Sequence, residues 1–520
     1  MKNENIKKRF EELYNSLLVD GKLPFAACLL ERAARLWPQR VALQEDDKFI
    51  TFEQLYQAAC GVSTFLEQTG IKAGERVIFL YENSIDFYKI YYGIWQTGAV
   101  IVPLNIFLHE KELAYIIDHV QPQALVVFSG LKEKVAKVQA NVPLFTEVEL
   151  LSYRDQKNTY PLQQQDPQEM AVLLYTSGTT GLPKGVMLSS ENILINVLQG
   201  VACFSITEQE RVYAALPLFH AYMQNTCLWS TILVGACTII IPKIERKALL
   251  RGLEKKPTFV LGIPALYGLF CLMKKACFEQ VKYFICGGDA LADKTRAYFE
   301  LLYRRKLCNG YGLTETAPFL CVNLLDEQAP TSSIGYPLYG IEIAVRDEAG
   351  HDVERGTIGI IWVKGKNIML GYYRDPKLTA AVLHHGWFNT ADMGYIDETG
   401  ALVLSGRESD LIKHKGMKIY PQEIENVLML HPQVILAAVI GVQDGAEEIP
   451  IAFISTAEQN PQLAEQLEAL CRKNIAAYKI PRHFIIHHQL PTTATGKVDK
   501  KLLKKAYNEK GPDYSFDFKS

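Results

Sequence analysis

The sequence predicts an α/β fold with a large N-terminal domain and a smaller C-terminal one. Of the 520 residues, 48% are apolar and 22% are charged, values typical of globular proteins with a large buried core. From about residue 50, short β-branched runs alternate with longer mixed segments, as expected for helices covering a mostly parallel, doubly wound sheet. The pattern changes near residue 340 and again after residue 406, which indicates two further units.

The N-terminal part contains the predicted parallel strands. Strands are expected at residues 76–80, 99–103, 124–128, 170–174, 237–241 and 282–286. Residues 84–98 carry apolar side chains around much of a helical wheel and predict a buried helix, whereas residues 1–18 predict an amphipathic one. Residues 227–241 predict a buried helix and strand, and the polar stretch 152–169 predicts a surface connection.

The last third of the chain is predicted to contain two smaller units. Short strands separated by turn signals after Gly340 predict an antiparallel β-subdomain. Beyond Gly406 we expect an α+β domain with helices at 421–430 and 462–475 and strands at 434–442, 449–455 and 483–487. Four lysines near the end are expected to be solvated surface charges: Lys500, Lys501, Lys504 and Lys505.

Composition excludes several classes of protein. A net charge of −2 provides no basic field for nucleic acid, so no nucleic-acid partner is expected. The 11 cysteines are odd in number and include no CxxC pair, which favours reduced thiols in the cytoplasm over disulfides or structural zinc. The N-terminus lacks the apolar run of a secretion signal, and no apolar stretch reaches the ~20 residues of a spanning helix. Peripheral contact with a membrane surface stays open.

The loop at residues 175–185 (YTSGTTGLPKG) is the most informative segment. It combines hydroxyl side chains, three glycines and Lys184 directly after a predicted strand. Glycines let backbone amides approach phosphate oxygens, while hydroxyls and a lysine add donors and positive charge, so the loop suits a polyphosphate. It is not a Walker A loop, because Pro183 stands where the second glycine should be. A flexible surface loop is the alternative that composition alone allows.

The loop resembles the phosphate-loop signature of the adenylate-forming superfamily (AMP-binding enzymes). Further segments resemble that family's motifs in the expected order: 216–220 (LPLFH), 286–291 (CGGDAL), 309–316 (NGYGLTET), 386–394 (GWFNTADMG), 406–425 (GRESDLIKHKGMKIYPQEIE) and 491–497 (PTTATGK). Seven ordered matches over nearly the whole chain are far more specific than one. The sequence is closest in look to the fatty acyl-CoA synthetases.

The resemblance implies a nucleotide site for ATP. The loop residues Thr176, Ser177, Gly178, Thr179, Thr180 and Lys184 would bind the phosphates. The residues Gly287, Gly288, Asp289, Asn309, Tyr311, Gly312 and Thr314 would surround the nucleotide, with Tyr311 stacked on adenine and Thr314 facing phosphate. Glu315 would hold Mg2+, which binds nucleotides through few protein carboxylates plus phosphate oxygens.

Asp392 would accept hydrogen bonds from the ribose hydroxyls, the role that acidic residues play in many nucleotide sites. The family's usual sequence there is TGD, whereas this chain has Thr390–Ala391–Asp392. Alanine can replace glycine unless the position requires a positive φ.

Two further residues are implied to be catalytic. Lys497 would bridge the substrate carboxylate and the α-phosphate, neutralising charge as it builds up on phosphorus. His220 would lie near the bound carboxylate or gate the acyl tunnel, although a histidine after an apolar run is equally often an ordinary core residue.

The resemblance also implies a mobile C-terminal domain. We expect domains at residues 1–408 and 409–520, the first built of two doubly wound subdomains and a β-subdomain. Arg407 would bind the nucleotide, Ser409 would be the pivot, and Lys415 and Gly416 would line the channel for CoA.

The implied activity is that of an acid–thiol ligase. A carboxylic acid, with a medium- or long-chain fatty acid expected, would react with ATP to form acyl-AMP and then transfer to CoA. Alternatives are loading of an acyl carrier protein, an aryl-CoA ligase, a luciferase-like oxygenase and a non-catalytic binding protein. The oligomeric state, monomer or homodimer, stays open.

Overall fold

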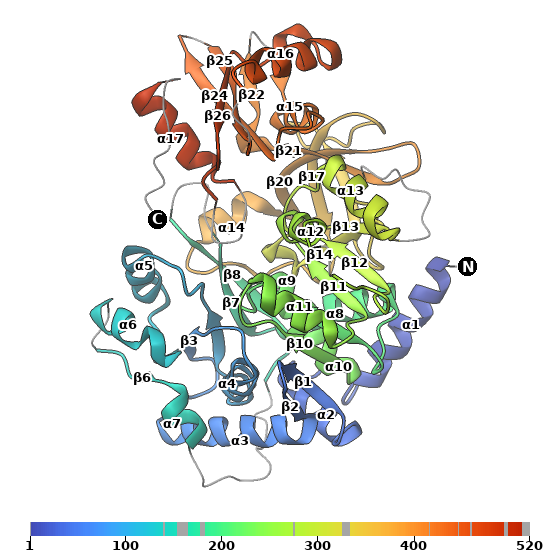
Figure 1. The fold of residues 1–520 in the computed structure, drawn as a ribbon. Helices are drawn as coiled ribbons and strands as arrows, with labels where there is room; N and C mark the ends of the chain where they lie inside the picture. Colours follow the sequence, from blue (N-terminus) through green and yellow to red (C-terminus); the bar gives the residue numbers. More distant parts are fainter. Residues whose placement is uncertain are drawn as a thin grey trace.

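The computed structural model describes residues 2–138, 141–152, 165–176, 182–273, 276–324, 333–414, 417–445, 447–457, 460–492 and 498–511. The chain forms two large α/β sheets, a small antiparallel subdomain and a C-terminal unit that lies at the top of Figure 1. The predicted α/β architecture is confirmed. Within these ranges no helix is long and apolar enough to cross a membrane.

The first sheet has seven strands in the order β18-β8-β7-β4-β3-β5-β6. They are β3 (Arg76–Leu80), β4 (Val100–Pro103), β5 (Ala124–Val127), β6 (Leu144–Phe145), β7 (Met170–Thr176), β8 (Lys184–Ser189) and β18 (Gly371–Tyr372). Its helices are α3 (Phe52–Gln68), α4 (Ile85–Gln96), α5 (Glu110–Val120), α6 (Lys132–Val138) and α7 (Glu147–Ser152). Strands β3 to β7 pair in parallel, whereas β8 runs antiparallel to both of its neighbours.

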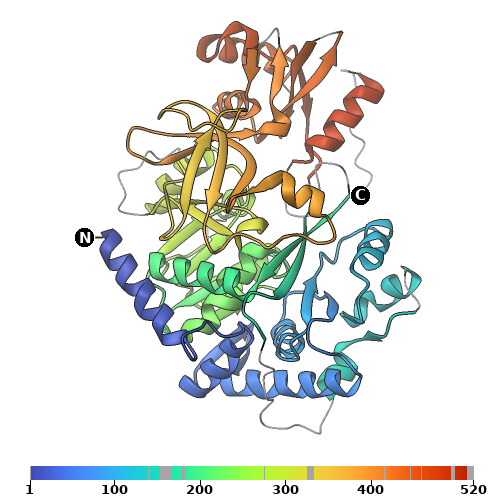
Figure 2. The same cartoon turned by 180° about the vertical axis from the view of Figure 1, so that it is seen from behind.

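The second sheet has nine strands in the order β15-β14-β13-β12-β11-β9-β10-β1-β2. They are β1 (Val41–Glu45), β2 (Lys48–Thr51), β9 (Arg211–Ala214), β10 (Cys237–Ile240), β11 (Phe259–Gly262), β12 (Tyr283–Cys286), β13 (Leu307–Gly312), β14 (Phe319–Val322) and β15 (Tyr336–Pro337). Its helices are α1 (Lys2–Leu17), α2 (Cys28–Leu36), α8 (Ser190–Phe204), α9 (Ala221–Met223), α10 (Ser230–Val234), α11 (Arg246–Glu254), α12 (Pro264–Cys271) and α13 (Asp293–Tyr303). Helix α1, predicted as amphipathic, lies beside α8 (Figure 2).

A buried π-helix, η2 (Gln224–Trp229), precedes α10 and β10. The predicted buried helix and strand are thus confirmed, but the π-helical turn was not predicted. Its wider turn displaces backbone carbonyls from their usual partners. Tyr88 and Tyr92 of α4 donate hydroxyl hydrogens to the carbonyls of Cys227 and Leu228 at 2.9 and 2.8 Å. These hydrogen bonds join α4, a helix of the first sheet, to the π-helix η2, which lies with the helices of the second sheet.

The antiparallel subdomain predicted after Gly340 is present. It contains β16 (Glu342–Arg346), β17 (Gly359–Lys364), β19 (Leu383–His384), β20 (Trp387–Ile396), β21 (Leu402–Arg407) and α14 (Pro376–Val382). Neighbouring strands pair antiparallel in the order β16-β17-β20-β19, with β21 also on β20.

The C-terminal unit contains the predicted helices and strands. It comprises β22 (Ile412–His414), β23 (Met417–Ile419), α15 (Pro421–Leu428), β24 (Leu436–Asp444), β25 (Glu447–Ser455), α16 (Leu463–Asn474), β26 (His483–His487) and α17 (Lys500–Lys510). The turn η4 (Glu408–Asp410) leads into it from β21. Two apolar clusters draw all their residues from 412 to 507, so the unit has a core of its own.

The expectation for the final lysines is wrong at Lys500. Helix α17, which was not predicted, places the Lys500 ammonium 2.7 Å from Glu425 and 3.9 Å from Asp410. Glu425 is buried, so the lysine compensates a charge that would otherwise be costly. Lys504 and Lys505 have the exposed side chains that were expected.

Candidate active site

The predicted phosphate loop is flanked by two paired strands. Thr176 ends β7 and Lys184 begins β8, and the two are opposite each other in the antiparallel ladder. The Thr176 hydroxyl is buried and has no hydrogen-bond partner in the described part of the chain. Because buried polar atoms are normally paired, this hydroxyl suits an oxygen-rich ligand in the loop.

A buried carboxylate, Glu315, is held by two side chains from the edge of the first sheet. It lies in the turn η3 (Thr314–Thr316) and is 6% exposed. Lys184 Nζ lies 3.1 Å from Glu315 Oε1, and Tyr372 Oη donates to the same oxygen at 2.8 Å. Lys184 Nζ also donates to Tyr372 Oη at 2.6 Å and lies 4.3 Å from the centroid of its ring. The three groups form one closed network.

This network leaves Glu315 suited to a metal ion. The contacts with Lys184 and Tyr372 both involve Oε1, one of the two carboxylate oxygens. Burial, and then the Glu315 charge, raise the pKa of Tyr372, which keeps its hydroxyl protonated and donating. No cluster of three or more histidine, cysteine or carboxylate ligands occurs in the described ranges. A single carboxylate can serve Mg2+, because that ion takes only one or two carboxylates when phosphate oxygens complete its shell.

Sequence reasoning missed Tyr372. The residue lies in a short strand, β18, whose pairing with β8 places Tyr372 opposite Val186. Tyr372 and Lys184 are 188 positions apart, and nothing in the local pattern indicates that they touch. Tyr311 and Asp392 were predicted because they lie within recognisable motifs, whereas the contacts of Tyr372 depend on strand pairing.

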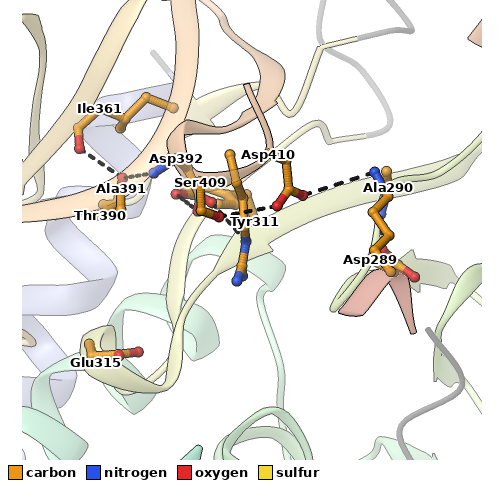
Figure 3. A network of polar contacts seen from close by, with 12 residues as sticks. Asp289, Ala290, Tyr311, Glu315, Ile361, Thr390, Ala391, Asp392, Ser409 and Asp410 are labelled. Atoms are coloured by element: carbon orange, nitrogen blue, oxygen red, sulfur yellow. Dashed lines mark hydrogen bonds and ion pairs between the residues drawn. The ribbon is translucent and has the colours of Figure 1, made fainter. Parts of the chain in front are cut away.

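A second network surrounds Asp392 in β20 (Figure 3). Tyr311 Oη donates to Asp392 Oδ2 at 2.6 Å, and Arg407 Nε lies 3.3 Å from Oδ1. Asp392 is buried, and its backbone amide donates to the Thr390 hydroxyl at 3.1 Å. The register of β20 and β21 pairs Asp392 with Arg407, so the contact follows from the sheet. The structure thus brings together three residues predicted for the nucleotide.

Electrostatics support this grouping. Burial would lower the pKa of the Arg407 guanidinium, but Asp392 and then Asp410 outweigh it, so its pKa is raised. Burial raises the pKa of Tyr311, and the Asp392 charge raises it further. Arg407 therefore stays charged and Tyr311 stays a neutral donor.

Ala391 adopts the conformation that normally requires glycine. Its φ is +55°, in the left-handed region, and its side chain is exposed. The backbone there is strained for alanine because Cβ approaches the neighbouring carbonyl oxygen. The departure from the family's TGD pattern therefore has a conformational cost, and the turn keeps its shape in spite of it.

The glycine-containing segments predicted to surround the nucleotide lie in or directly after β12 and β13. Gly288 has a φ of +79°, which favours glycine. A Cβ at Gly312 would lie 1.8 Å from the Pro318 carbonyl oxygen, so only glycine fits there. Asp289 accepts a hydrogen bond from the Ala290 amide at 2.9 Å. Gly287 directly follows β12, Asn309 lies within β13, and Thr314 begins η3 just after β13 ends. Carboxyl ends of parallel strands are where open α/β sheets bind ligands.

His220 acts in this structure as the N-cap of α9. Its Nδ1 accepts from the Tyr222 amide at 3.3 Å, and its carbonyl accepts from the amides of Met223 and Gln224. This is a structural contact, and it does not test the predicted role beside a bound carboxylate. Several predicted residues lie outside the described residues: Ser177, Gly178, Thr179, Thr180, Lys415, Gly416 and Lys497.

Two family models match the chain. The model for AMP-binding enzymes covers residues 30–373, and that for the AMP-binding enzyme C-terminal domain covers residues 423–497. A long-chain-fatty-acid–CoA ligase of Bacillus subtilis is 31% identical over 91% of this chain and 93% of its own. A feruloyl-CoA synthase of an Amycolatopsis species is 30% identical over 92% and 98%.

Solved structures show the same similarity. The crystal structure of ATP-bound MatB from Rhodopseudomonas palustris has a TM-score of 0.88 and 27% identity, covering 93% of this chain and 99% of that one.

Replacing Ala391 by glycine is expected to stabilise the protein by about 1 kcal/mol, because glycine removes the left-handed strain. The measurement is the shift in the urea denaturation midpoint. Ala349→Gly is the control, since Ala349 is exposed and its φ is not positive. Equal effects of the two changes would contradict the strain at Ala391.

Tyr372→Phe is expected to weaken MgATP binding about fivefold, because it removes a hydrogen bond to a charged group worth about 1 kcal/mol. The ring and its contact with Lys184 remain. Binding is measured by calorimetry with a non-hydrolysable ATP analogue and Mg2+. Tyr373→Phe is the matched control, because Tyr373 lies next in the chain and its hydroxyl donates to the Val120 carbonyl at the long distance of 3.5 Å. An unchanged affinity for Tyr372→Phe would contradict the assignment.

Proposed function

Because the chain belongs to the AMP-binding enzyme family and is an AMP-forming acid–thiol ligase that uses ATP, Mg2+ and CoA, we propose that its acid is a medium- or long-chain fatty acid. The carboxylate would attack the α-phosphorus of ATP, releasing pyrophosphate and forming acyl-AMP. The CoA thiol would then attack the acyl carbonyl, and AMP would leave. Relatives include both fatty-acid and aryl-acid ligases, so the nature of the acid depends on this chain's own cavity.

An apolar cavity between α8 and the second sheet carries the proposal. It is lined by Gly200, Phe204, Ile206, Val212, Asn225, Thr226, Ser230, Phe259, Leu261, Ile285 and Phe319. No lining residue is charged. An aliphatic chain gains free energy on entering such a space, whereas an acid with further polar groups would leave them unpaired.

The three polar residues of the lining are already satisfied. Asn225 donates to Asn196 Oδ1 at 3.0 Å and to the Ala317 carbonyl at 2.9 Å. Thr226 donates to the Tyr222 carbonyl at 2.8 Å, and Ser230 donates to Asn225 Oδ1 at 3.3 Å. Because these groups bond to the protein, they offer little to a polar substrate, and the wall behaves as an apolar surface.

The side chain of Tyr222 lies between the cavity and Gly287, one of the residues predicted to surround the nucleotide. The Tyr222 ring lies 5.6 Å from the ring of Phe319, which lines the cavity, and 3.6 Å from where a Cβ would be at Gly287. An acid in the cavity would therefore reach the nucleotide past Tyr222. The cavity holds only about 10 Å³, roughly one water molecule, so side chains must move to admit an acyl chain.

Two of the lining residues, Phe204 and Phe259, belong to a cluster of packed aromatic rings. The ring centroid of Phe204 lies 6.3 Å from Phe259 and 5.5 Å from Tyr283, and those two rings stack at 5.0 Å. Phe204 is the residue among them that comes from the helix rather than from the sheet. It is the most direct candidate to limit how long an acyl chain can be.

The roles of the site residues are proposed as follows. Lys184 and the Thr176 hydroxyl would hold phosphate oxygens, Asp392 would hold the ribose, and Glu315 would hold Mg2+. Bound Mg2+ would supply positive charge that stabilises the leaving pyrophosphate. Lys497 would neutralise charge on the α-phosphate, and His220 would lie near the carboxylate. Catalysis of this kind depends on positioning and charge, without a covalent enzyme intermediate.

We further propose the domain boundary between residues 408 and 409, with Ser409 as pivot and with Lys415 and Gly416 lining the CoA channel. The separate apolar clusters on the two sides of η4 support it, and Ser409 is exposed. The odd number of cysteines supports a cytoplasmic location.

Pyrophosphate release measured over saturated acids of graded length, with ferulate and benzoate beside them, tests the substrate. We expect kcat/KM to rise with chain length beyond four carbons, because each buried methylene contributes about 0.8 kcal/mol. Phe204→Ala should move the optimum to longer acids. Ferulate or benzoate as the best substrate would contradict the fatty-acid proposal. Supplying CoA and an acyl carrier protein in parallel identifies the thiol acceptor.

Lys497→Ala is expected to lower acid-dependent ATP–pyrophosphate exchange by about 10²–10³-fold, because it removes a charge that stabilises the transition state by about 3–4 kcal/mol. Thioester formation from supplied acyl-AMP should stay close to the wild-type rate. Lys505→Ala is the control, since Lys505 is an exposed lysine whose ion pair with Glu509 lies within its own helix. Equal loss in both assays would contradict the role of Lys497.

A further inference from the structure

A partly buried histidine contacts the strand that leads into the predicted phosphate loop. His119 lies in the last turn of α5, which ends beside β7 and β8 (Figure 1). Its Nδ1 lies 2.6 Å from Tyr175 Oη, and the two rings meet edge to face at 6.0 Å. Tyr175 directly precedes Thr176, whose buried hydroxyl has no partner in the described part of the chain. The contact therefore lies one residue away from a group that suits a phosphate oxygen.

The end of β7 is held by backbone pairing and by this side chain. Strand β8 pairs with β7 as far as Thr176, which lies opposite Lys184, while Tyr175 lies opposite Gly185. On the other side of β7, strand β4 pairs with it at Val172, three residues before Tyr175. The contact between Tyr175 and His119 thus adds a restraint at the strand end, where the loop begins.

The rings around His119 pack against the start of β8. A Cβ at Gly185 would lie 3.2 Å from Tyr175 Cζ and 3.3 Å from Tyr373 Cβ. The Tyr373 amide donates to the Gly185 carbonyl at 2.8 Å, and the rings of Tyr373 and His119 meet edge to face at 5.6 Å. Gly185 directly follows Lys184, and close-packed groups transmit displacements to their neighbours. A change at His119 would therefore reach the backbone that carries the Lys184 ammonium.

Two consecutive tyrosines connect this cluster with the Glu315 network. Tyr372 contacts Lys184 and Glu315, whereas Tyr373 contacts His119. Successive side chains of an extended segment point to opposite sides, so the two tyrosines serve different contacts. The segment at β18 thus touches the candidate metal ligand with one tyrosine and the His119 cluster with the next.

The surroundings of His119 keep its imidazole neutral near pH 7. In the described part of the chain, the titratable and charged groups that face it are Tyr115, Asp118, Tyr175, Tyr373, Arg374 and Asp375. Burial lowers the pKa of His119, and Arg374 lowers it further, which together outweigh Asp118 and Asp375. Burial also raises the pKa of Tyr175, so its hydroxyl stays protonated.

Protonation of His119 would break its contact with Tyr175 in the present sense. A neutral imidazole can accept the Tyr175 hydroxyl hydrogen at Nδ1, whereas both nitrogens of the charged ring are donors. The charge would also lie near Arg374, which donates to the His119 carbonyl at 3.0 Å. The change occurs as the pH falls through the pKa of His119, which lies below its ordinary value.

We propose that His119 is a positioning residue for MgATP: its neutral ring accepts the Tyr175 hydroxyl hydrogen and so holds the strand ends that carry Thr176 and Lys184. This role rests on the proposed function, which assigns phosphate oxygens to those two residues. His119 itself touches no ligand and acts through Tyr175. MgATP therefore binds most tightly while the ring is neutral, and its affinity falls as the ring takes up a proton.

Two substitutions separate the hydrogen bond from the packing. His119→Phe keeps a ring without an acceptor, whereas His119→Asn places Oδ1 where Nδ1 stood and does not titrate. Calorimetry at about pH 7.5 gives the dissociation constant of a non-hydrolysable ATP analogue with Mg2+. We expect His119→Phe to weaken binding about fivefold and His119→Asn to stay within about twofold of wild type.

Tyr175→Phe removes the other half of the same bond. It should weaken binding as much as His119→Phe does. The variant with both changes should bind no more weakly than either single variant, because the second change removes nothing further. Fully additive losses would contradict a shared hydrogen bond.

Acidification tests the titration of the ring. Between about pH 7.5 and pH 5.5, wild type should lose at least about twofold more affinity than His119→Asn. Titration of the nucleotide affects both proteins equally, so it cancels in this comparison. In the free protein, histidine NMR should show that Tyr175→Phe raises the pKa of His119, because the neutral ring loses its donor. The resonance is identified by its loss in His119→Asn.

His384→Asn is the matched control. The ring of His384 also lies beside an aromatic side chain, 5.6 Å from that of Trp362, and its Nε2 lies 3.1 Å from the Ala381 carbonyl oxygen. The affinity for MgATP and its pH dependence should match wild type in this variant.

The outcomes separate a positioning role from a merely structural one. Equal weakening in His119→Phe and His119→Asn, wild-type affinity in His119→Phe, or the same pH dependence in wild type and His119→Asn would overturn the role. The pH comparison needs only those last two proteins, so it decides the question even where His119→Phe fails to fold. Wild-type protein that binds no MgATP analogue at any pH would instead contradict the proposed function.

Discussion

The ion pair between Lys184 and Glu315 is the contact on which the arrangement of the site depends. Lys184 begins β8 of the first sheet, while Glu315 lies in the turn that follows β13 of the second. Tyr372 forms hydrogen bonds with both residues. It lies in β18, which follows β16 and β17 of the antiparallel subdomain in the chain. A buried carboxylate is costly unless paired, so this contact favours one placement of the two sheets relative to each other. The same three groups suit a bound magnesium nucleotide, so the contact that favours this arrangement of the sheets also belongs to the candidate active site.

The second network extends this principle toward the C-terminal unit. Asp392 and Arg407 lie opposite each other in the β20–β21 ladder, and Arg407 directly precedes the turn that enters the unit. The field of Asp410 acts on Arg407 from the far side of that turn. A nucleotide held by Asp392 would therefore lie beside the residues that connect the units. Lys294 of α13 also contacts the C-terminal unit, because its ammonium donates to the carbonyls of His431, Pro432 and Val434.

Much of the fold followed from local patterns. The β-branched runs at 76–80, 124–128 and 237–241 became β3, β5 and β10 because buried parallel strands need apolar side chains on both faces. Helix α17 was not predicted because its lysines suggest a solvated segment. Lys500 pairs with the buried Glu425, a contact that the local sequence does not indicate. The π-helix at Gln224–Trp229 was missed because its displaced carbonyls are satisfied by tyrosines of α4, more than a hundred positions away.

By itself the sequence predicted the candidate site residues, Lys184 through the composition of the loop at 175–185, and Glu315, Tyr311 and Asp392 through the resemblance of short motifs to a known family. Only the tertiary structure decided how those groups are held and what surrounds them. Tyr372 reaches Glu315 through strand pairing, the apolar cavity is lined from several distant segments, and the left-handed turn at Ala391 is set by its sheet. The reason is physical: composition and periodicity record local preference and burial, whereas contacts between residues far apart in sequence depend on how whole elements pack.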